Sequence, residues 1–134
     1  MAGFNARTRG IGWSSWLAFC GAALMLAGCT SGLNVAPEAY RGPSIASATT
    51  SGVHLILAEL PSPGWGLEID ATRESADRTD VFLTLRRPNP AAVYPQQVVT
   101  QRAVTRVDED EPLGIVARVI DYGGESDTAY RRVR

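Results

Sequence analysis

The sequence predicts an all-β domain of five or six strands over residues 52–134, arranged as a small antiparallel sandwich or open barrel. Apolar residues in this region recur at every second position in runs of five to nine residues, which is typical of half-buried strands. Clusters of Pro, Gly, Asn and Asp separate the runs, as turns between strands require. A domain of this size buries only about 60 to 65% of its unfolded surface, so we expect a small free energy of unfolding.

Three strands are expected in the first half of the domain. The segment Val53–Leu60 is nearly all apolar, so we expect a central strand that is covered on both faces. On each of the next two strands one face is apolar, formed by Trp65, Leu67 and Ile69 and then by Val81, Leu83 and Leu85. Between these strands, residues 71–80 are polar, which predicts a turn or one short helical turn.

The second half begins with residues 87–96, which contain three prolines and therefore predict an irregular loop or an edge strand. The alternating pattern resumes over residues 97–107. The acidic residues 108–112 should form a tight link, after which residues 113–120 pair back as a hairpin. A final short strand is expected over residues 128–133.

Residues 1–28 have the features of a secretory signal. Arg7 and Arg9 make the start positive, and Glu38 is the first acid of the chain. Residues 16–27 form an apolar run of twelve residues, whereas a helix that spans a bilayer needs about 20. We therefore expect this segment to be removed.

The apolar run ends on a motif that resembles the lipobox of bacterial lipoproteins, namely Leu26, Ala27, Gly28 and Cys29. The resemblance implies that a signal peptidase recognises the first three residues and that the thiol of Cys29 accepts diacylglycerol. Cys20 would leave with the signal, so the mature protein would have no free thiol and no disulfide. The alternatives are an ordinary cleaved signal or an uncleaved anchor.

Residues 29–51 predict a lipidated cysteine followed by a flexible linker. The linker is rich in Ser, Thr, Ala, Gly and Pro and lacks a sustained apolar period. As a flexible coil of some twenty residues it would hold the domain roughly 25 Å from the bilayer. A short piece around Val35–Tyr40 could dock on the domain.

The net charge and the residue after Cys29 bear on partners and location. Removal of residues 1–28 takes away two of the thirteen arginines and none of the fourteen acids, so the net charge falls from −1 to −3. Nucleic acid is therefore not an expected partner.

Thr30, rather than Asp, follows Cys29. In a cell with two membranes, this residue favours location of the protein at the outer membrane, facing the periplasm. In a cell with one membrane, the protein would face outward.

Few residues could support catalysis or metal binding. A Ser-His or Cys-His couple needs an imidazole or thiolate, and the mature chain offers only His54, for which we expect a structural hydrogen bond. We expect no metal site and no cofactor, because the several His or Cys ligands of a zinc site are absent. The acidic run Asp108–Glu111 could hold Ca²⁺ weakly but is better interpreted as a solvated turn.

The turn Pro61–Trp65 is the best candidate for a partner contact. Proline presets φ at one turn position and glycine accepts a positive φ, so we expect a stiff turn that presents Trp65. Tryptophan is a frequent binding hot spot, but the favoured interpretation is that Trp65 begins the core face with Leu67 and Ile69, and the two roles can coexist. Pro63, beside it, and Tyr94, in the proline-rich loop, are the other candidate contacts.

The segments 61–69 (PSPGWGLEI) and 88–100 (PNPAAVYPQQVVT) resemble the PrcB-type protease-complex lipoproteins, with coverage of about Val53–Val107. The resemblance implies a small β-domain that associates with or stabilises an exported protease and has no catalysis of its own. Our first hypothesis is therefore a membrane-tethered binding module. The alternatives are a structural lipoprotein of the cell envelope without a protease partner and, third, a small hydrolase that uses carboxylates.

Overall fold

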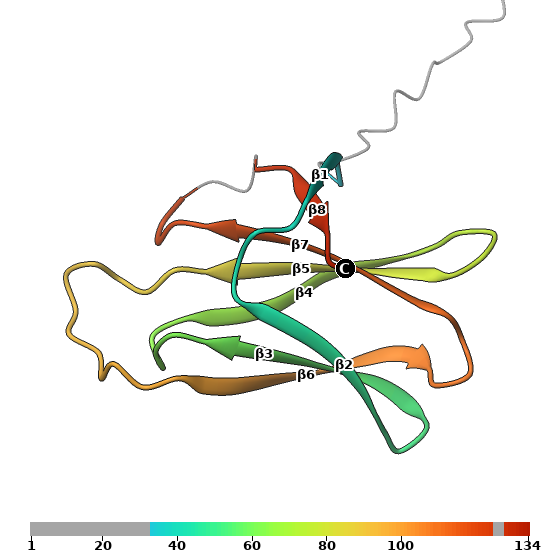
Figure 1. Ribbon diagram of the computed structural model, residues 1–134, viewed down its shortest axis with the longest axis horizontal. Coiled ribbons are helices and arrows are strands. Elements are labelled where there is room, and N and C mark those ends of the chain that lie inside the picture. Colours follow the sequence, from blue (N-terminus) through green and yellow to red (C-terminus); the bar gives the residue numbers. More distant parts are fainter. Residues whose placement is uncertain (1–32, 125–127) are drawn as a thin grey trace, which may run out of the picture.

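The computed structural model describes residues 33–124 and 128–134, and within these ranges the chain is all-β. It forms two sheets packed face to face, as Figure 1 shows. The predicted fold class is confirmed, and the sheets do not close into a barrel. The predicted signal peptide and the lipobox residues Leu26 to Cys29 lie outside the described residues.

The described residues contain eight strands: β1 (Val35–Ala39), β2 (Ser44–Thr50), β3 (Val53–Leu60), β4 (Gly66–Glu74), β5 (Thr79–Arg86), β6 (Val99–Asp108), β7 (Leu113–Ile120) and β8 (Tyr130–Arg132). One sheet has the order β1-β8-β7-β5-β4, and the other has the order β2-β3-β6. β1 pairs with β8 and β5 pairs with β7 in parallel, while the remaining pairs are antiparallel. The expected five or six strands over residues 52–134 are confirmed, since this range holds β3 to β8, but the expectation that all pairs are antiparallel is wrong.

The extra strands come from the segment expected to be a flexible linker. β1 and β2 occupy most of residues 35–50, so that prediction is wrong from Val35 onward, although the suggested docking of Val35–Tyr40 is confirmed. β2 pairs with β3 along its whole length, from Ser44 opposite Glu59 to Thr50 opposite Val53. The folded domain therefore already includes residues 33–51, ahead of the expected start at residue 52.

The strand covered on both faces is β5, because every residue from Thr79 to Leu85 is buried. β3 is central in its sheet, as expected, but Glu59 is exposed and Leu55 and Leu57 are only half-buried. The prediction of double coverage was therefore placed on the wrong strand. Residues 71–74, expected in a turn, extend β4 instead.

The link Asp108–Pro112 carries the chain from one sheet to the other. β6 belongs to the three-stranded sheet and β7 to the five-stranded sheet, where β7 lies between β5 and β8. The predicted hairpin between residues 97–107 and 113–120 is therefore wrong. Sequence alternation identifies a strand but does not specify its neighbour.

The core lies between the two sheets and consists of small and branched apolar side chains: Ile56, Ala58, Leu60, Val81, Leu83, Leu85, Val107 and Ala117. A second cluster, formed by Phe82, Val116 and Tyr130, covers the outer face of the five-stranded sheet, and Leu33 and Val35 pack against it. The rings of Phe82 and Tyr130 meet edge to face with centroids 5.1 Å apart. The start of the described chain is thus fastened to the outer face.

No helix in the described ranges is long and apolar enough to cross a membrane.

Candidate functional site

The turn at residues 61–65 and the loop at residues 87–98 lie together at one end of the sandwich, on the left in Figure 1. The turn connects β3 to β4, and the loop connects β5 to β6. Gln101, near the start of β6, donates a hydrogen bond of 2.6 Å from Nε2 to the carbonyl oxygen of Trp65. This bond ties the turn to the strand into which the loop leads. We call the turn and the loop together the loop end.

Backbone contacts and a close aromatic ring shape the turn. The amide of Trp65 donates to the carbonyl oxygen of Ser62 over 3.3 Å. A Cβ atom at position 64 would lie 2.6 Å from Cε1 of Tyr94, so glycine is needed here for close approach. Gly64 is not among the described glycines with positive φ, and the sequence-based reason for a glycine at this position was therefore wrong.

The loop is held at its start and is apolar at its tip. The side-chain oxygen of Asn89 accepts a hydrogen bond of 2.9 Å from the amide of Ala91, and its carbonyl oxygen accepts one of 3.1 Å from the amide of Ala92. Beyond this turn, Val93 is 99% exposed and Val98 is 68% exposed. Large apolar side chains with so much exposure are candidates for contact with another molecule.

The three candidate contact residues differ in their surroundings. Trp65 is half-buried and packs against the core with Leu67 and Ile69, so its predicted core role is confirmed. Pro63 is exposed, and Tyr94 is half-buried against Gly64. The structure therefore brings the two predicted segments together, while contact with a partner stays a prediction.

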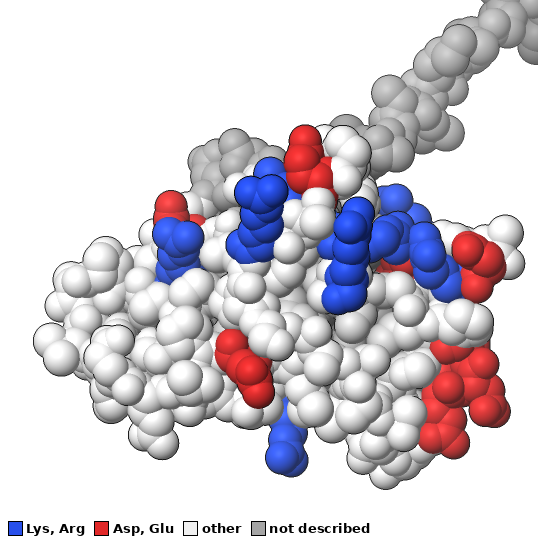
Figure 2. Space-filling model, viewed as in Figure 1, with Lys and Arg blue, Asp and Glu red and all other residues white. Residues whose placement is uncertain are grey.

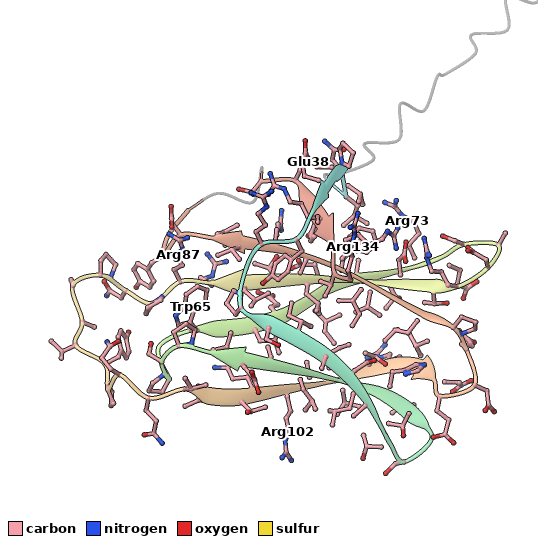
Figure 3. All side chains as sticks on the ribbon, viewed as in Figure 1. Glu38, Trp65, Arg73, Arg87, Arg102 and Arg134 are labelled. Carbon is pink, nitrogen blue, oxygen red and sulfur yellow. The ribbon has the colours of Figure 1, made fainter. Side chains whose placement is uncertain are left out.

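Apart from Arg87 at its border, the loop end carries no charged residue. None of residues 61–65 or 88–98 is charged, and the left end of the molecule in Figure 2 is almost entirely white. At the border of this end, Arg87 forms an ion pair of 3.4 Å with Asp121. Arg87 and Trp65 are both labelled in Figure 3. An uncharged surface with aromatic and aliphatic side chains is suited to protein recognition, because the centres of protein interfaces are depleted in charge.

The chain matches no family model, no curated protein and no solved structure. The geometry of the site is therefore the basis for a functional proposal.

The other residues considered from the sequence have structural contacts. Nε2 of His54 donates a hydrogen bond of 2.8 Å to the carbonyl oxygen of Glu111, as expected for a structural histidine. The carboxylate of Glu111 accepts a hydrogen bond of 3.1 Å from Thr79. Among the described residues, no group of three or more His, Cys, Asp or Glu side chains could hold a metal ion.

A polar network on the outer face of the five-stranded sheet was missed by sequence reasoning. Oδ2 of Asp70 accepts hydrogen bonds from the hydroxyls of Thr84 and Tyr130, and Nε of Arg118 donates to Thr84 over 2.8 Å. The guanidinium of Arg118 also lies 4.3 Å from the ring centroid of Tyr130. Burial, reinforced by the hydrogen bond to Asp70, raises the pKa of Tyr130.

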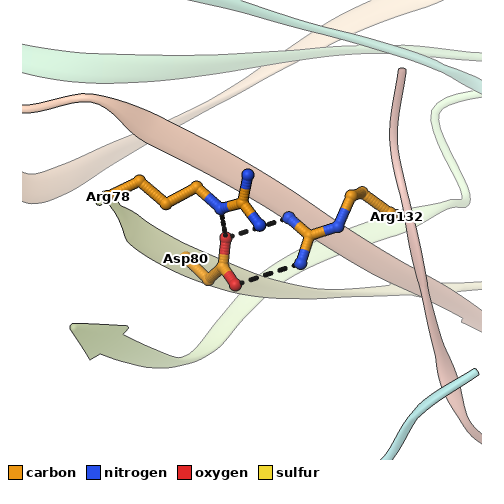
Figure 4. A network of polar contacts seen from close by, with 3 residues as sticks. All are labelled: Arg78, Asp80 and Arg132. Atoms are coloured by element: carbon orange, nitrogen blue, oxygen red, sulfur yellow. Dashed lines mark hydrogen bonds and ion pairs between the residues drawn. The ribbon is translucent and has the colours of Figure 1, made fainter. Parts of the chain in front are cut away.

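A buried carboxylate lies on β5. Asp80 is 7% exposed and accepts hydrogen bonds from Arg132 over 3.1 and 3.3 Å, one to each carboxylate oxygen. Arg78 adds a third bond of 3.0 Å (Figure 4). The available signal was Phe82, an aromatic residue among the polar residues that alternate with Val81, Leu83 and Leu85. The structure shows that this second face is also buried, so its polar groups must be satisfied by hydrogen bonds.

Proposed function

We propose that this protein is a lipoprotein, anchored by Cys29, whose β-sandwich binds an exported protein through the loop end and has no catalytic activity. The observation that carries the proposal is the exposure of Val93 and Val98 beside Tyr94 on a surface without charge. Burial of such side chains against a partner is favourable, at about 25 cal/mol per Å² of apolar surface. In a cell with two membranes, the anchor would hold the domain on the periplasmic face of the outer membrane.

The loop end is preorganised for binding. Asn89 holds the start of the loop, Gln101 ties the turn to β6, and Tyr94 fills the space above Gly64. A surface that is already ordered loses less conformational entropy when a partner binds. The resemblance to PrcB-type lipoproteins rests partly on these same two segments, and it would make the partner an exported protease.

The test of binding is a pull-down of the detergent-extracted protein with paired variants. We expect Val98→Asp, at the loop end, to reduce recovery of the partner at least tenfold, because it buries a charge in the interface. Val104→Asp on β6 is the matched control, since Val104 is 61% exposed but lies away from the loop end. Its recovery should equal that of the wild type.

Two results would contradict this proposal. If no exported protein co-purifies with the wild type, a structural lipoprotein of the envelope becomes the better interpretation. If Val98→Asp and Val104→Asp recover a partner equally well, binding does not use the loop end. The anchor is tested separately by incorporation of labelled palmitate, which Cys29→Ala should abolish.

A further inference from the structure

The described part of the domain reaches very close in sequence to the proposed lipid site. Only Thr30, Ser31 and Gly32 separate Cys29 from Leu33, the first described residue. Four residue-to-residue intervals separate Cys29 from Leu33. Even a fully extended chain of this length spans at most about 14 Å between the two Cα atoms. This limit is well below the roughly 25 Å expected for a linker of some twenty residues. A lipidated Cys29 would therefore hold Leu33 within this distance of the lipid headgroups.

Leu33 precedes β1 by two residues, and β1 lies with β8 at the top of Figure 1. Leu33 packs against the outer cluster of Phe82, Val116 and Tyr130. Its carbonyl oxygen accepts a hydrogen bond of 3.4 Å from the guanidinium of Arg73. Because Leu33 is fixed to this side of the sandwich, the same side must approach the membrane.

Three arginines lie near these elements, and we call them the membrane-side arginines: Arg41, two residues after β1, Arg131 on β8, and Arg73, which contacts Leu33. Arg73 lies over the ring of Phe82, with its guanidinium 4.9 Å from the ring centroid. Arg41 and Arg131 line a cavity of about 350 Å³ between the end of β1 and β7. Glu38 is the one carboxylate among the residues described around that cavity. In Figure 2, blue side chains gather along the upper part of the molecule.

The membrane-side arginines differ from two other arginines of this sheet, Arg118 and Arg132, which form ion pairs. Arg118 pairs with Asp70 at 3.7 Å, and Arg132 pairs with Asp80 at 3.1 Å. In the described part of the chain, no carboxylate lies within 4.0 Å of Arg41, Arg73 or Arg131. Their charges are therefore available to an external anion.

We infer that the membrane-side arginines seat this face of the domain on anionic lipid headgroups. The inference rests on the proposed lipidation of Cys29. Each arginine near an anionic bilayer strengthens binding by about fivefold, and guanidinium groups suit phosphate through paired hydrogen bonds. The loop end lies on a different side of the sandwich, so it remains open to a protein partner while the domain is seated.

The experiment uses the mature lipidated protein in vesicles and a single thiol as a probe. Since Cys29 carries the lipid, Asn34→Cys introduces the one free thiol, at an exposed position beside Leu33. Its rate of reaction with a charged maleimide is measured in phosphatidylcholine vesicles, with and without roughly one third phosphatidylglycerol. We expect the anionic lipid to slow the reaction at position 34 at least fivefold. In the control Thr100→Cys, on β6, the rate should not change.

Charge variants separate electrostatic seating from simple crowding at the membrane. In the Asn34→Cys background, the triple change Arg41→Gln, Arg73→Gln and Arg131→Gln should remove the slowing by anionic lipid. The pair Arg102→Gln and Arg106→Gln on β6 should retain it; Figure 3 shows Arg102 on the opposite side of the molecule. Circular dichroism checks that each variant is folded.

Flotation with neutral vesicles reports lipid anchoring independently of seating. If the protein floats but anionic lipid does not change the rate at position 34, the inference is overturned while the proposed anchor stands. The inference is also overturned if the triple variant behaves like the wild type. If the protein fails to float, Cys29 is not lipidated, and both the anchor and the seating are rejected.

Discussion

The hydroxyl of Tyr130 donates a hydrogen bond of 2.7 Å to Oδ2 of Asp70 and thereby joins the C-terminal strand β8 to the edge strand β4 across the outer face of the sheet. The ring of Tyr130 is 1% exposed. Tyr130→Phe keeps the ring but removes the donor, so it should lower the free energy of unfolding by about 1 to 2 kcal/mol. Urea denaturation measures this change, and an unchanged midpoint would show that water replaces the hydroxyl.

Tyr40 provides the opposite case. Its hydroxyl oxygen is buried and has no hydrogen-bond partner among the described residues. An unsatisfied polar group in the interior is destabilising. Tyr40→Phe should therefore leave the free energy of unfolding unchanged or raise it by up to about 1 kcal/mol, as measured by urea denaturation. A loss comparable to that of Tyr130→Phe would reveal a partner for this hydroxyl.

Both tyrosines should make the fold sensitive to alkaline pH. Burial raises the pKa of Tyr40 to about 12, and burial together with Asp70 raises the pKa of Tyr130. In the unfolded chain, tyrosine loses its proton near pH 10. Between pH 10 and 12 the unfolded state therefore binds fewer protons than the folded state, and stability falls as pH rises. The stability that the two protonated tyrosines contribute is fully retained below pH 10.

Denaturation midpoints measured from pH 8 to 11 would show this loss. The double variant with Tyr40→Phe and Tyr130→Phe should lose less stability than the wild type over the same range. If the two proteins lose stability in parallel above pH 10, other groups cause the effect.

Asp80 should be more important to stability than either of its partners alone. The carboxylate is almost fully buried, whereas the side chains of Arg78 and Arg132 are 36% and 39% exposed. Asp80→Ala leaves two arginines without their carboxylate, but both side chains can turn toward water. We therefore expect the free energy of unfolding to fall by about 1 to 3 kcal/mol, which is less than the cost of breaking a fully buried ion pair. Arg78→Gln should cost less than about 1 kcal/mol. Thermal and urea unfolding compare the two variants, and equal losses would contradict this ranking.

The sequence predicted the fold class and several strands because alternation of apolar side chains is a local signal. The bounds of Val53–Leu60 and Leu113–Ile120 agree with β3 and β7. β1 and β2 were missed because VAPEA and SIASATT contain small, polar and proline residues instead of an apolar stripe. These strands are specified by pairing with β8 and β3, which are distant contacts that local periodicity does not contain.

The candidate site was predictable in its parts but not in its assembly. Prolines identified the loop, and prolines with a glycine identified the turn, as irregular segments, and Trp65 was recognised as both core and candidate contact. The contact between Tyr94 and Gly64, the hydrogen bond from Gln101, and the network around Asp70 each join separate strands or loops. Such relationships depend on sheet order, which alternation leaves open.

Gly64→Ala should separate the shape of the loop end from the stability of the domain. The added methyl group would lie 2.6 to 2.7 Å from three carbon atoms of the Tyr94 ring, so the ring must move. Because Tyr94 belongs to a surface loop that can shift without opening the core, the free energy of unfolding should fall by less than about 1 kcal/mol. Recovery of the partner should nevertheless fall several-fold, since the preorganised surface is lost.

The double variant Gly64→Ala with Tyr94→Ala is the control for this explanation. Removal of the ring relieves the clash, so the free energy of unfolding should not fall further than in Tyr94→Ala alone. In such a double-mutant cycle, a coupling energy different from zero shows that the two positions interact. Additive losses of stability and of partner recovery would mean that Gly64 acts independently of Tyr94, and the close packing of ring on turn would then not be what shapes the binding surface.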